Sequence, residues 1–203
     1  MLEKAMANLI KNGFQARYVE NAAEATAMVL GKITPGASVG VGGSITIRQL
    51  NLIEILRQQG HKVYDHWQEG LSPDEIREMQ WHNLTSQVFL ASTNAITADG
   101  KLVNTDNTGN RVAAMIFGPQ QVIVVAGKNK IVADVDAALQ KIKEKVTQLV
   151  ARRRQENTAC AATGICEDCD GPHRLCRATT ILERKTMGVG TFSVIIVGEP
   201  LGY

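Results

Sequence analysis

Aromatic residues are scarce in this chain, and it lacks long apolar runs and a large excess of either charge. Phe, Trp and Tyr make up 4% of its 203 residues, so a platform that stacks nucleic-acid bases is not expected. No apolar run approaches the roughly 20 residues of a membrane-spanning helix, so we expect no membrane insertion. The 22 basic and 20 acidic residues give a net charge of +2. Composition therefore gives no support for general nucleic-acid binding.

Cysteine is confined to one short stretch, CAATGICEDCDGPHRLC. It holds all four cysteines, Cys160, Cys166, Cys169 and Cys176, at the spacing C-x5-C-x2-C-x6-C. Four thiolates are soft ligands that can enclose zinc or hold an iron–sulfur cluster. Gly164, Gly171 and Pro172 suit a loop that folds around an ion. The spacing matches neither the usual zinc pattern nor the bacterial ferredoxin run, so the sequence favours a metal without selecting one.

Disulfides, redox switching and inert thiols are the alternatives for these cysteines, and His173 is an alternative ligand. The first 20 residues include Glu3, Lys4, Lys11 and Arg17 and lack the apolar core of a secretory signal. We therefore expect a cytoplasmic protein, in which clustered cysteines more often bind metal or react than form disulfides.

Helical and strand patterns alternate along the chain. Helices are predicted from Leu2 to Ile10, Asn21 to Leu30, Ile45 to Gly60, Ser72 onward, Asn110 to Phe117, and Val135 to Leu149. Strands are predicted at 15–19, 38–41, 62–65, 88–91, 122–126, 179–182 and 194–197, with an antiparallel hairpin around Asp99–Gly100. The alternation predicts one α/β domain over 1–203, with a mostly parallel sheet flanked by helices and a cysteine-rich loop at about 158–178.

The first candidate binding element is the glycine loop, which we define as residues 40–46, Gly40-x-Gly42-Gly43-Ser44-x-Thr46. It lies between a predicted strand and a predicted helix, where backbone amides can bind phosphate or carboxylate. The spacing fits neither the dinucleotide fingerprint nor a Walker loop. A steric turn with a helix cap is the structural alternative.

The second candidate is the asparagine-rich segment, which we define as residues 93–111. It surrounds the predicted hairpin with small polar side chains and includes Arg111, whose guanidinium can bind a carboxylate or phosphate. Asn, Asp, Thr and Gly are also the residues that tight turns use, so a purely structural reading stays open.

Three weaker candidates remain. Lys128-Asn129-Lys130 follows the most apolar strand and can supply a cation at the strand ends, although solvated lysines are the alternative. Arg152–Arg154 read best as a solvated helix end. Glu54 is a general-base candidate whose default role is a surface helix glutamate. His61 lies between Gly60 and a predicted strand, where a role in the turn suffices, and His66 and His82 have no partner at metal-ligand spacing.

Four segments in this order resemble the LUD (lactate-utilisation domain) family. They are GVGGSITIRQL, STNAITADGKLVNTDNTGNRVAAMIFGPQQVIVVAGKNKIV, the cysteine stretch and VIIVGEPLGY. The resemblance spans nearly the whole chain, and the cysteine loop looks like that of stand-alone members from anaerobic bacteria and archaea.

The resemblance implies a fold similar to the ribose-5-phosphate isomerase, coenzyme A transferase and formyltetrahydrofolate cyclo-ligase group. It implies a binding site for a small anionic metabolite between two walls. One wall has Gly42, Gly43, Ser44 and Thr46. The other has Asn94, Thr97, Asn104, Asn110 and Arg111. This is fold-level analogy, and a fold does not determine a function.

The resemblance also implies a role in lactate-type organic-acid oxidation, as an accessory or subunit protein that works with iron–sulfur partner proteins. An autonomous isomerase or transferase acting on a phosphorylated or CoA-linked metabolite is one alternative. A non-enzymatic redox or metal sensor is another. No catalytic carboxylate is identifiable from the sequence beyond Glu54, and whether the chain is an enzyme stays open.

Overall fold

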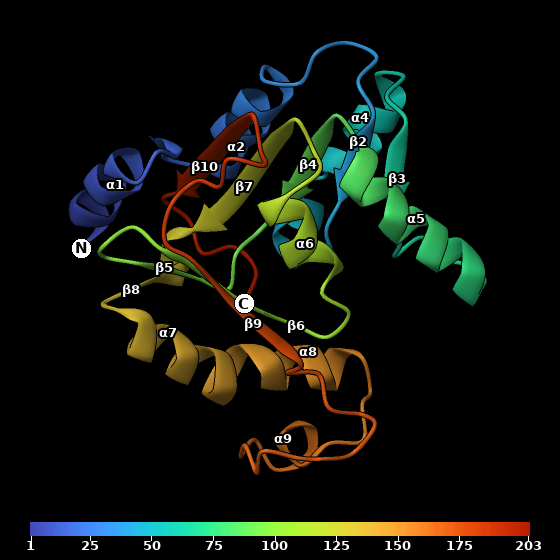
Figure 1. Cartoon of the computed structure of the whole chain (residues 1–203), viewed down its shortest axis with the longest axis vertical. Helices are drawn as coiled ribbons and strands as arrows, with labels where there is room; N and C mark the ends of the chain where they lie inside the picture. The colour runs from blue at the N-terminus through green and yellow to red at the C-terminus, as the bar shows by residue number, and fades with distance from the viewer.

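Two β-sheets organise the protein, whose structure is a computed structural model that describes residues 1–203 (Figure 1). The larger sheet is entirely parallel. Its strands, in spatial order, are β1 (Gln15–Val19), β10 (Thr191–Val197), β7 (Gln121–Gly127), β4 (Val88–Ala91), β2 (Val39–Val41) and β3 (Val63–Asp65). The central strands are mostly apolar because both of their faces are covered.

Helices cover both faces of the parallel sheet. One face packs against α2 (Ala22–Leu30), α3 (Ile45–Gln49) and α4 (Leu52–Gln58). The other packs against α1 (Leu2–Lys11) and α6 (Asn110–Ile116), and α5 (Pro73–Thr85) lies beside α6. Successive residues of each strand point to opposite faces, so one strand contributes alternately to two apolar cores.

The second sheet is mixed and lies between the parallel sheet and a long helix (Figure 1). Its strands, in order, are β8 (Ile131–Val132), β5 (Ala95–Thr97), β6 (Leu102–Asp106) and β9 (Ala178–Leu182). The long helix consists of α7 (Val135–Lys141), a π-helical turn η2 (Ile142–Val146) and α8 (Thr147–Arg153). Ala138 and Ile142 of this helix pack on Ala95 and Val103 of the sheet.

The predicted α/β architecture and the hairpin are confirmed, and two expectations change. The helix predicted from Ile45 to Gly60 is split, because Asn51 adopts a left-handed conformation with φ of 52° between α3 and α4. The predicted strand at 179–182 does form, as part of β9, but it pairs antiparallel with β6 in the second sheet. Both differences depend on packing that local periodicity does not encode.

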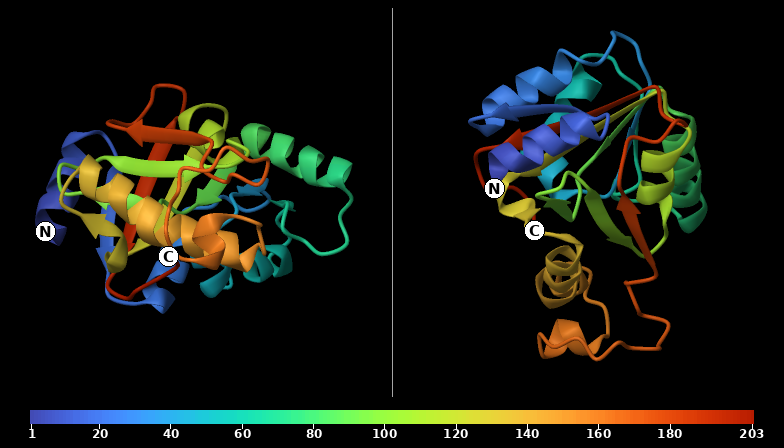
Figure 2. Two further views of the ribbon diagram at one scale, coloured as in Figure 1. Left: turned by 90° about the horizontal axis from the view of Figure 1, so that it is seen from below. Right: turned by 60° about the vertical axis from the view of Figure 1, so that its left-hand side comes forward.

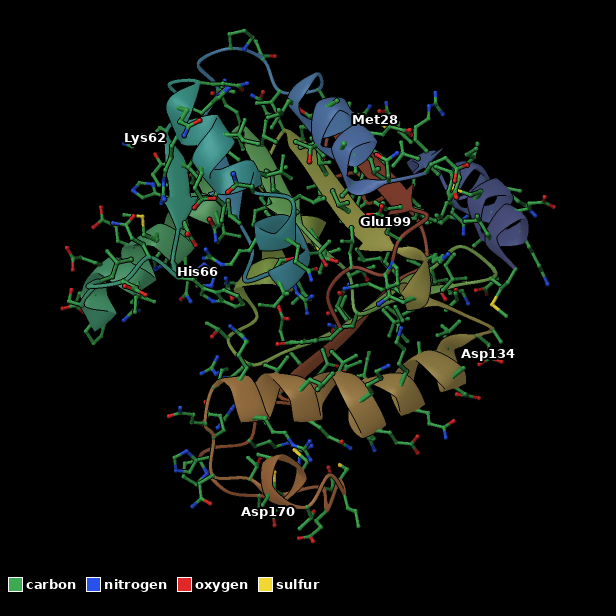
Figure 3. The ribbon with its side chains drawn as sticks, turned by 180° about the vertical axis from the view of Figure 1, so that it is seen from behind. Met28, Lys62, His66, Asp134, Asp170 and Glu199 are labelled. Carbon is green, nitrogen blue, oxygen red and sulfur yellow. The ribbon has the colours of Figure 1, made fainter.

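The cysteine loop, residues 158–178, contains the short helix α9 (Ala159–Ala162). It lies beyond the long helix, on the side away from the parallel sheet, as the right-hand view of Figure 2 shows. Asp170, labelled in Figure 3, marks its position. None of the helices combines the length and apolar character needed to cross a bilayer.

Candidate functional site

A cleft of about 910 Å³ opens at the carboxyl ends of the parallel strands. Its residues follow directly on β2, β3, β4 and β7, whose carboxyl ends share one edge of the sheet. The opposite wall comes from the end of β6 and from the long helix. Ligands of open α/β sheets bind outside the carboxyl ends of the strands, so the cleft occupies the expected place for a ligand site.

The glycine loop forms one wall of this cleft. A Cβ atom added at Gly43 would lie 2.6 Å from the indole of Trp67, so only glycine allows the indole to pack on this backbone. The Ser44 hydroxyl accepts a hydrogen bond from the Ile47 amide at 3.3 Å and thereby caps α3. The structural alternative therefore holds for Ser44, although its side chain also lines the cleft.

The asparagine-rich segment forms part of the other wall and is tied together by its own side chains. The Asn94 amide donates to Asn104 Oδ1 at 3.0 Å, and Asn94 Oδ1 accepts from the Thr105 amide at 2.9 Å. Arg111 forms a salt bridge with Asp106 and donates to Asn94 and to the carbonyl oxygens of Ser92 and Thr105. Arg111 thus holds the residues of this wall together, and Asp106 neutralises its charge.

Six of the nine predicted ligand residues line the cleft: Gly43, Ser44, Thr46, Asn94, Asn110 and Arg111. The other three lie outside its lining. At Gly42 an added Cβ would lie 3.1 Å from Phe89, so this residue serves packing. Thr97 bonds to Asp99 and Lys101 within the hairpin turn, and Asn104 is fully buried between Asn94 and Met115.

Cations concentrate around the cleft. Five basic side chains line it, against the single acidic side chain of Asp106: Arg48, Arg111, Lys130, Arg153 and Arg154. Arg48, Arg111 and Arg154 form salt bridges with acidic side chains. Lys130 and Arg153 form none, so neither side chain is tied to a carboxylate side chain. The electrostatics of the cleft favour an anion.

Trp67 organises the rim of the cleft. The guanidinium carbon of Arg153 lies 4.1 Å from its ring centroid, and that of Arg48 lies 5.1 Å away. Burial lowers the pKa of Arg153. Arg153 is exposed at the end of α8, as the interpretation of Arg152–Arg154 as a solvated helix end predicts, and it also packs against an aromatic ring contributed by the residue two positions after β3.

Unpaired polar atoms gather at the same place. Four buried side-chain nitrogen or oxygen atoms lack a hydrogen-bond partner: Thr46 Oγ1, His66 Nδ1, Asn83 Oδ1 and Asn110 Nδ2. All but Asn83 belong to residues that line the cleft. Burial lowers the pKa of His66, which is labelled in Figure 3, so its imidazole is neutral at pH 7. Buried polar atoms normally have partners, so this concentration makes the cleft the candidate ligand site.

Lys130 lies at the base of the cleft, at the end of the short helix η1 (Lys128–Lys130) that follows β7. It is 4% exposed, and its amine donates to Ser92 Oγ at 3.1 Å and to the Thr93 carbonyl oxygen at 3.0 Å. Burial and the charge of Arg111 lower its pKa to about 7. Lys128 is exposed, which agrees with the alternative that this segment holds solvated lysines, but Lys130 is buried. The sequence signal for a role of this segment at the cleft was its position directly after the most apolar strand.

The cysteine loop folds around a second, much smaller cavity of about 40 Å³, which all four cysteines line. Arg174 braces the loop by donating to the carbonyl oxygens of Cys169 and Cys176, both at 2.8 Å. All four cysteines are free thiols. No three histidine, cysteine or acidic side chains are grouped closely enough to ligate a single metal ion.

The cysteine cavity and the cleft share two wall residues, Thr147 and Leu175. Thr147 begins α8, directly after the π-helical turn, and its hydroxyl accepts a hydrogen bond from the Cys176 thiol at 3.4 Å. Leu175 precedes Cys176 in the loop. The two cavities are therefore neighbours, separated by side chains of the long helix and the cysteine loop.

The comparisons with known proteins agree with this architecture. A crystal structure of a DUF162 family protein from Deinococcus radiodurans has the same fold, with a TM-score of 0.57 and 16% sequence identity over 97% of this chain and 96% of that one. A search of curated proteins found no match. The family model for the LUD domain matches residues 2–197, a range that includes both walls of the cleft and the cysteine loop, and this chain therefore belongs to the LUD domain family.

Proposed function

We propose that this protein is an accessory or subunit protein of lactate-type organic-acid oxidation that binds a small anionic metabolite in the cleft. The observation that carries the proposal is that an unpaired cation, a buried amine and unpaired polar atoms line the same cleft. Arg153 supplies the charge, Lys130 supplies the amine, and Thr46, His66 and Asn110 supply further hydrogen-bonding atoms. Membership of the LUD family supports the metabolic context.

We further propose that the cysteine loop holds an iron–sulfur centre, with zinc as the alternative. The four cysteines supply the type of ligand that such a centre needs, and they line one cavity. They would have to move closer together to bind it, because no three of them are grouped closely enough for one metal ion. Such a centre would supply one-electron transfer, and iron–sulfur partner proteins would exchange electrons with it. Arg174 would brace the loop through its hydrogen bonds to the carbonyl oxygens of Cys169 and Cys176. Thr147 and Leu175, which line both cavities, would separate the centre from the cleft.

A thermal-shift screen tests the ligand. Lactate and pyruvate should raise the melting temperature, and Arg153→Gln should weaken the effect because it removes an unpaired cation from the cleft. Arg152→Gln is the matched control: it removes the same charge one residue away, where the side chain donates to the Ala161 carbonyl oxygen instead. Equal loss in both variants would argue against the cleft as the binding site.

Elemental analysis and visible absorption of protein purified without oxygen test the centre. Iron, sulfide and a brown colour that disappear in the Cys160, Cys166, Cys169 and Cys176→Ser variants support the cluster. A His173→Ala variant that keeps its metal would confirm that His173 is not a ligand. Equimolar zinc without colour would assign the loop as a zinc clamp. Metal-free protein whose assembly changes on reversible cysteine oxidation would favour the sensor alternative.

The size of the cleft favours a second candidate function, turnover of a phosphorylated or CoA-linked metabolite by an isomerase or transferase. A volume of about 910 Å³ exceeds what a three-carbon acid needs and lies in the range of pockets for much larger ligands. Sugar phosphates or CoA esters that stabilise the protein in the same screen, while lactate and pyruvate do not, would support this function in place of the first.

A further inference from the structure

Lys130 has properties that simple anion binding does not require. It ends η1 at the carboxyl end of β7, it is 4% exposed and its amine nevertheless borders the cleft. A lysine that serves only as a counter-ion is usually solvated or paired with a carboxylate. Lys130 is neither, so its burial needs another explanation.

The charges around Lys130 favour an uncharged amine. No acidic side chain forms a salt bridge with it, and the charged groups that act on it are cations, Arg111 from α6 and Lys141 from α7. Together with burial they lower its pKa to about 7, so a substantial fraction of the amine is unprotonated at neutral pH. Arg111 has Asp106 as its partner, whereas Lys130 has no carboxylate side chain as a partner.

The hydrogen bonds of Lys130 leave its lone pair free. An unprotonated amine has two N–H donors and one lone pair. Ser92 Oγ and the Thr93 carbonyl oxygen accept at 3.1 and 3.0 Å, and these two bonds use both donors. The lone pair has no donor in the protein and is available to an electrophile in the cleft.

Space and a second polar group lie beside this amine. A Cβ atom added at Gly202 would lie 3.2 Å from Lys130 Nζ and 2.4 Å from Thr46 Oγ1, so both atoms border one small volume that glycine keeps open. Thr46 is 1% exposed, and its hydroxyl is one of the unpaired polar atoms. A carbonyl oxygen placed there would accept the hydrogen bond that Thr46 lacks.

We propose that Lys130 is a nucleophilic amine that forms an imine with a 2-oxo acid bound in the cleft. Nζ attacks the carbonyl carbon, a C–N bond forms and the carbonyl oxygen becomes a hydroxyl. This hydroxyl then leaves as water, which carries away both protons that Nζ held, and a C=N bond results. The step needs no oxidant or reductant. Thr46 would bind the carbonyl oxygen, and the cations of the cleft would bind the carboxylate.

This inference rests on the proposed binding of an organic acid in the cleft, and it specifies the ligand as a carbonyl-bearing acid. Lactate, which has a hydroxyl in place of the carbonyl, would bind but form no imine. An acid–base role for Lys130 and a purely structural role are the competing explanations. Neither of them creates a covalent bond to the ligand.

Borohydride trapping tests the proposal on the full-length protein. Pyruvate or glyoxylate is added, borohydride reduces any imine to a stable secondary amine, and mass spectrometry of the intact protein and its peptides locates the adduct. We expect one adduct on Lys130, with a yield that falls at least about tenfold in Lys130→Met and rises with pH through about 7. Lys128→Met is the matched control, since Lys128 is exposed on the same short helix. Lactate should give no adduct.

A thermal shift measured in parallel separates the two proposals. Pyruvate that stabilises the protein without a trapped adduct would overturn the imine and leave the binding function standing. Pyruvate that neither stabilises nor is trapped would remove both. An adduct spread over exposed lysines and unchanged in Lys130→Met would also overturn the assignment. Gly202→Ala, which fills the volume between Lys130 and Thr46, should reduce trapping while Lys130 remains present.

Discussion

Arg111 and Lys130 both donate hydrogen bonds to Ser92, although they lie on different elements, α6 and η1. Arg111 Nη1 donates to the Ser92 carbonyl oxygen at 3.3 Å, and Lys130 Nζ donates to the Ser92 hydroxyl at 3.1 Å. Only Arg111 has a carboxylate partner. The two basic side chains that meet at Ser92 therefore have different roles: Arg111 holds the wall of the cleft, and the Lys130 amine stays available to a ligand.

Loss of Arg111 should destabilise the fold. Its side chain is 10% exposed and that of Asp106 is 11% exposed, so Arg111→Met would leave a nearly buried carboxylate without its partner. We expect a loss of about 3–5 kcal/mol in the free energy of unfolding, measured with urea. Adding Asp106→Asn to Arg111→Met should cost less than the two single variants summed. A loss below about 1 kcal/mol in the free energy of unfolding of Arg111→Met alone would contradict this structural role of Arg111.

Stability should depend on pH through Lys130. Its pKa falls from 10.5 to about 7 on folding, so between these values the unfolded chain binds one more proton and stability rises with pH. Below pH 7 the amine is protonated in both states and the full cost of burying the charge remains. The free energy of unfolding of the wild type, relative to Lys130→Met, should rise by up to about 1.4 kcal/mol per pH unit across this window. A constant difference from pH 6 to 10 would rule out the low pKa.

Tryptophan fluorescence should report on the cleft. Trp67 packs between Arg48 and Arg153 at the rim, whereas Trp81 is 60% exposed on α5 and does not line the cleft. An anion that binds Arg153 should alter the emission of Trp67, and sodium chloride should weaken the response. Trp81→Phe should keep the ligand-dependent change and Trp67→Phe should lose it. The reverse result would place the ligand elsewhere.

Gly100 should tolerate alanine much less well than Gly60. Both have positive φ angles, 80° and 82°, and so carry the same conformational cost of about 1 kcal/mol. At Gly100 an added Cβ would also lie 2.5 Å from the backbone of Asn8 in α1, while at Gly60 it would meet nothing within 4 Å. We expect Gly100→Ala to lower the free energy of unfolding by at least about 2 kcal/mol more than Gly60→Ala. Similar losses would mean that α1 moves aside.

Local sequence signals account for much of the fold. Ser72, Pro73 and Glu75 predict the start of α5, and the structure has a full capping box there. Asp99–Gly100 predicts the hairpin between β5 and β6, which forms. These features depend on residues within a few positions of one another. The second sheet was not predictable in the same way, because β9 reaches β6 across more than 70 residues.

The candidate site was likewise predictable only in part from the sequence. The glycine loop and the asparagine-rich segment are visible as composition, but which of their side chains face the cleft depends on the neighbours that fill the other directions. Thr97 turns into the hairpin and Asn104 into the core, whereas Thr46 remains unpaired. Trp67 and Arg153 are far apart in sequence, and only packing shows that they stack.

The sequence by itself determined the α/β alternation, the turns, the helix caps and the presence of four clustered cysteines, since each follows from near neighbours in the chain. Tertiary structure alone decided that these cysteines face one cavity beside the cleft and that Lys130, two residues from solvated Lys128, is buried. The physical reason is that burial and unpaired charge depend on every element packed around a group, and those elements come from distant parts of the chain.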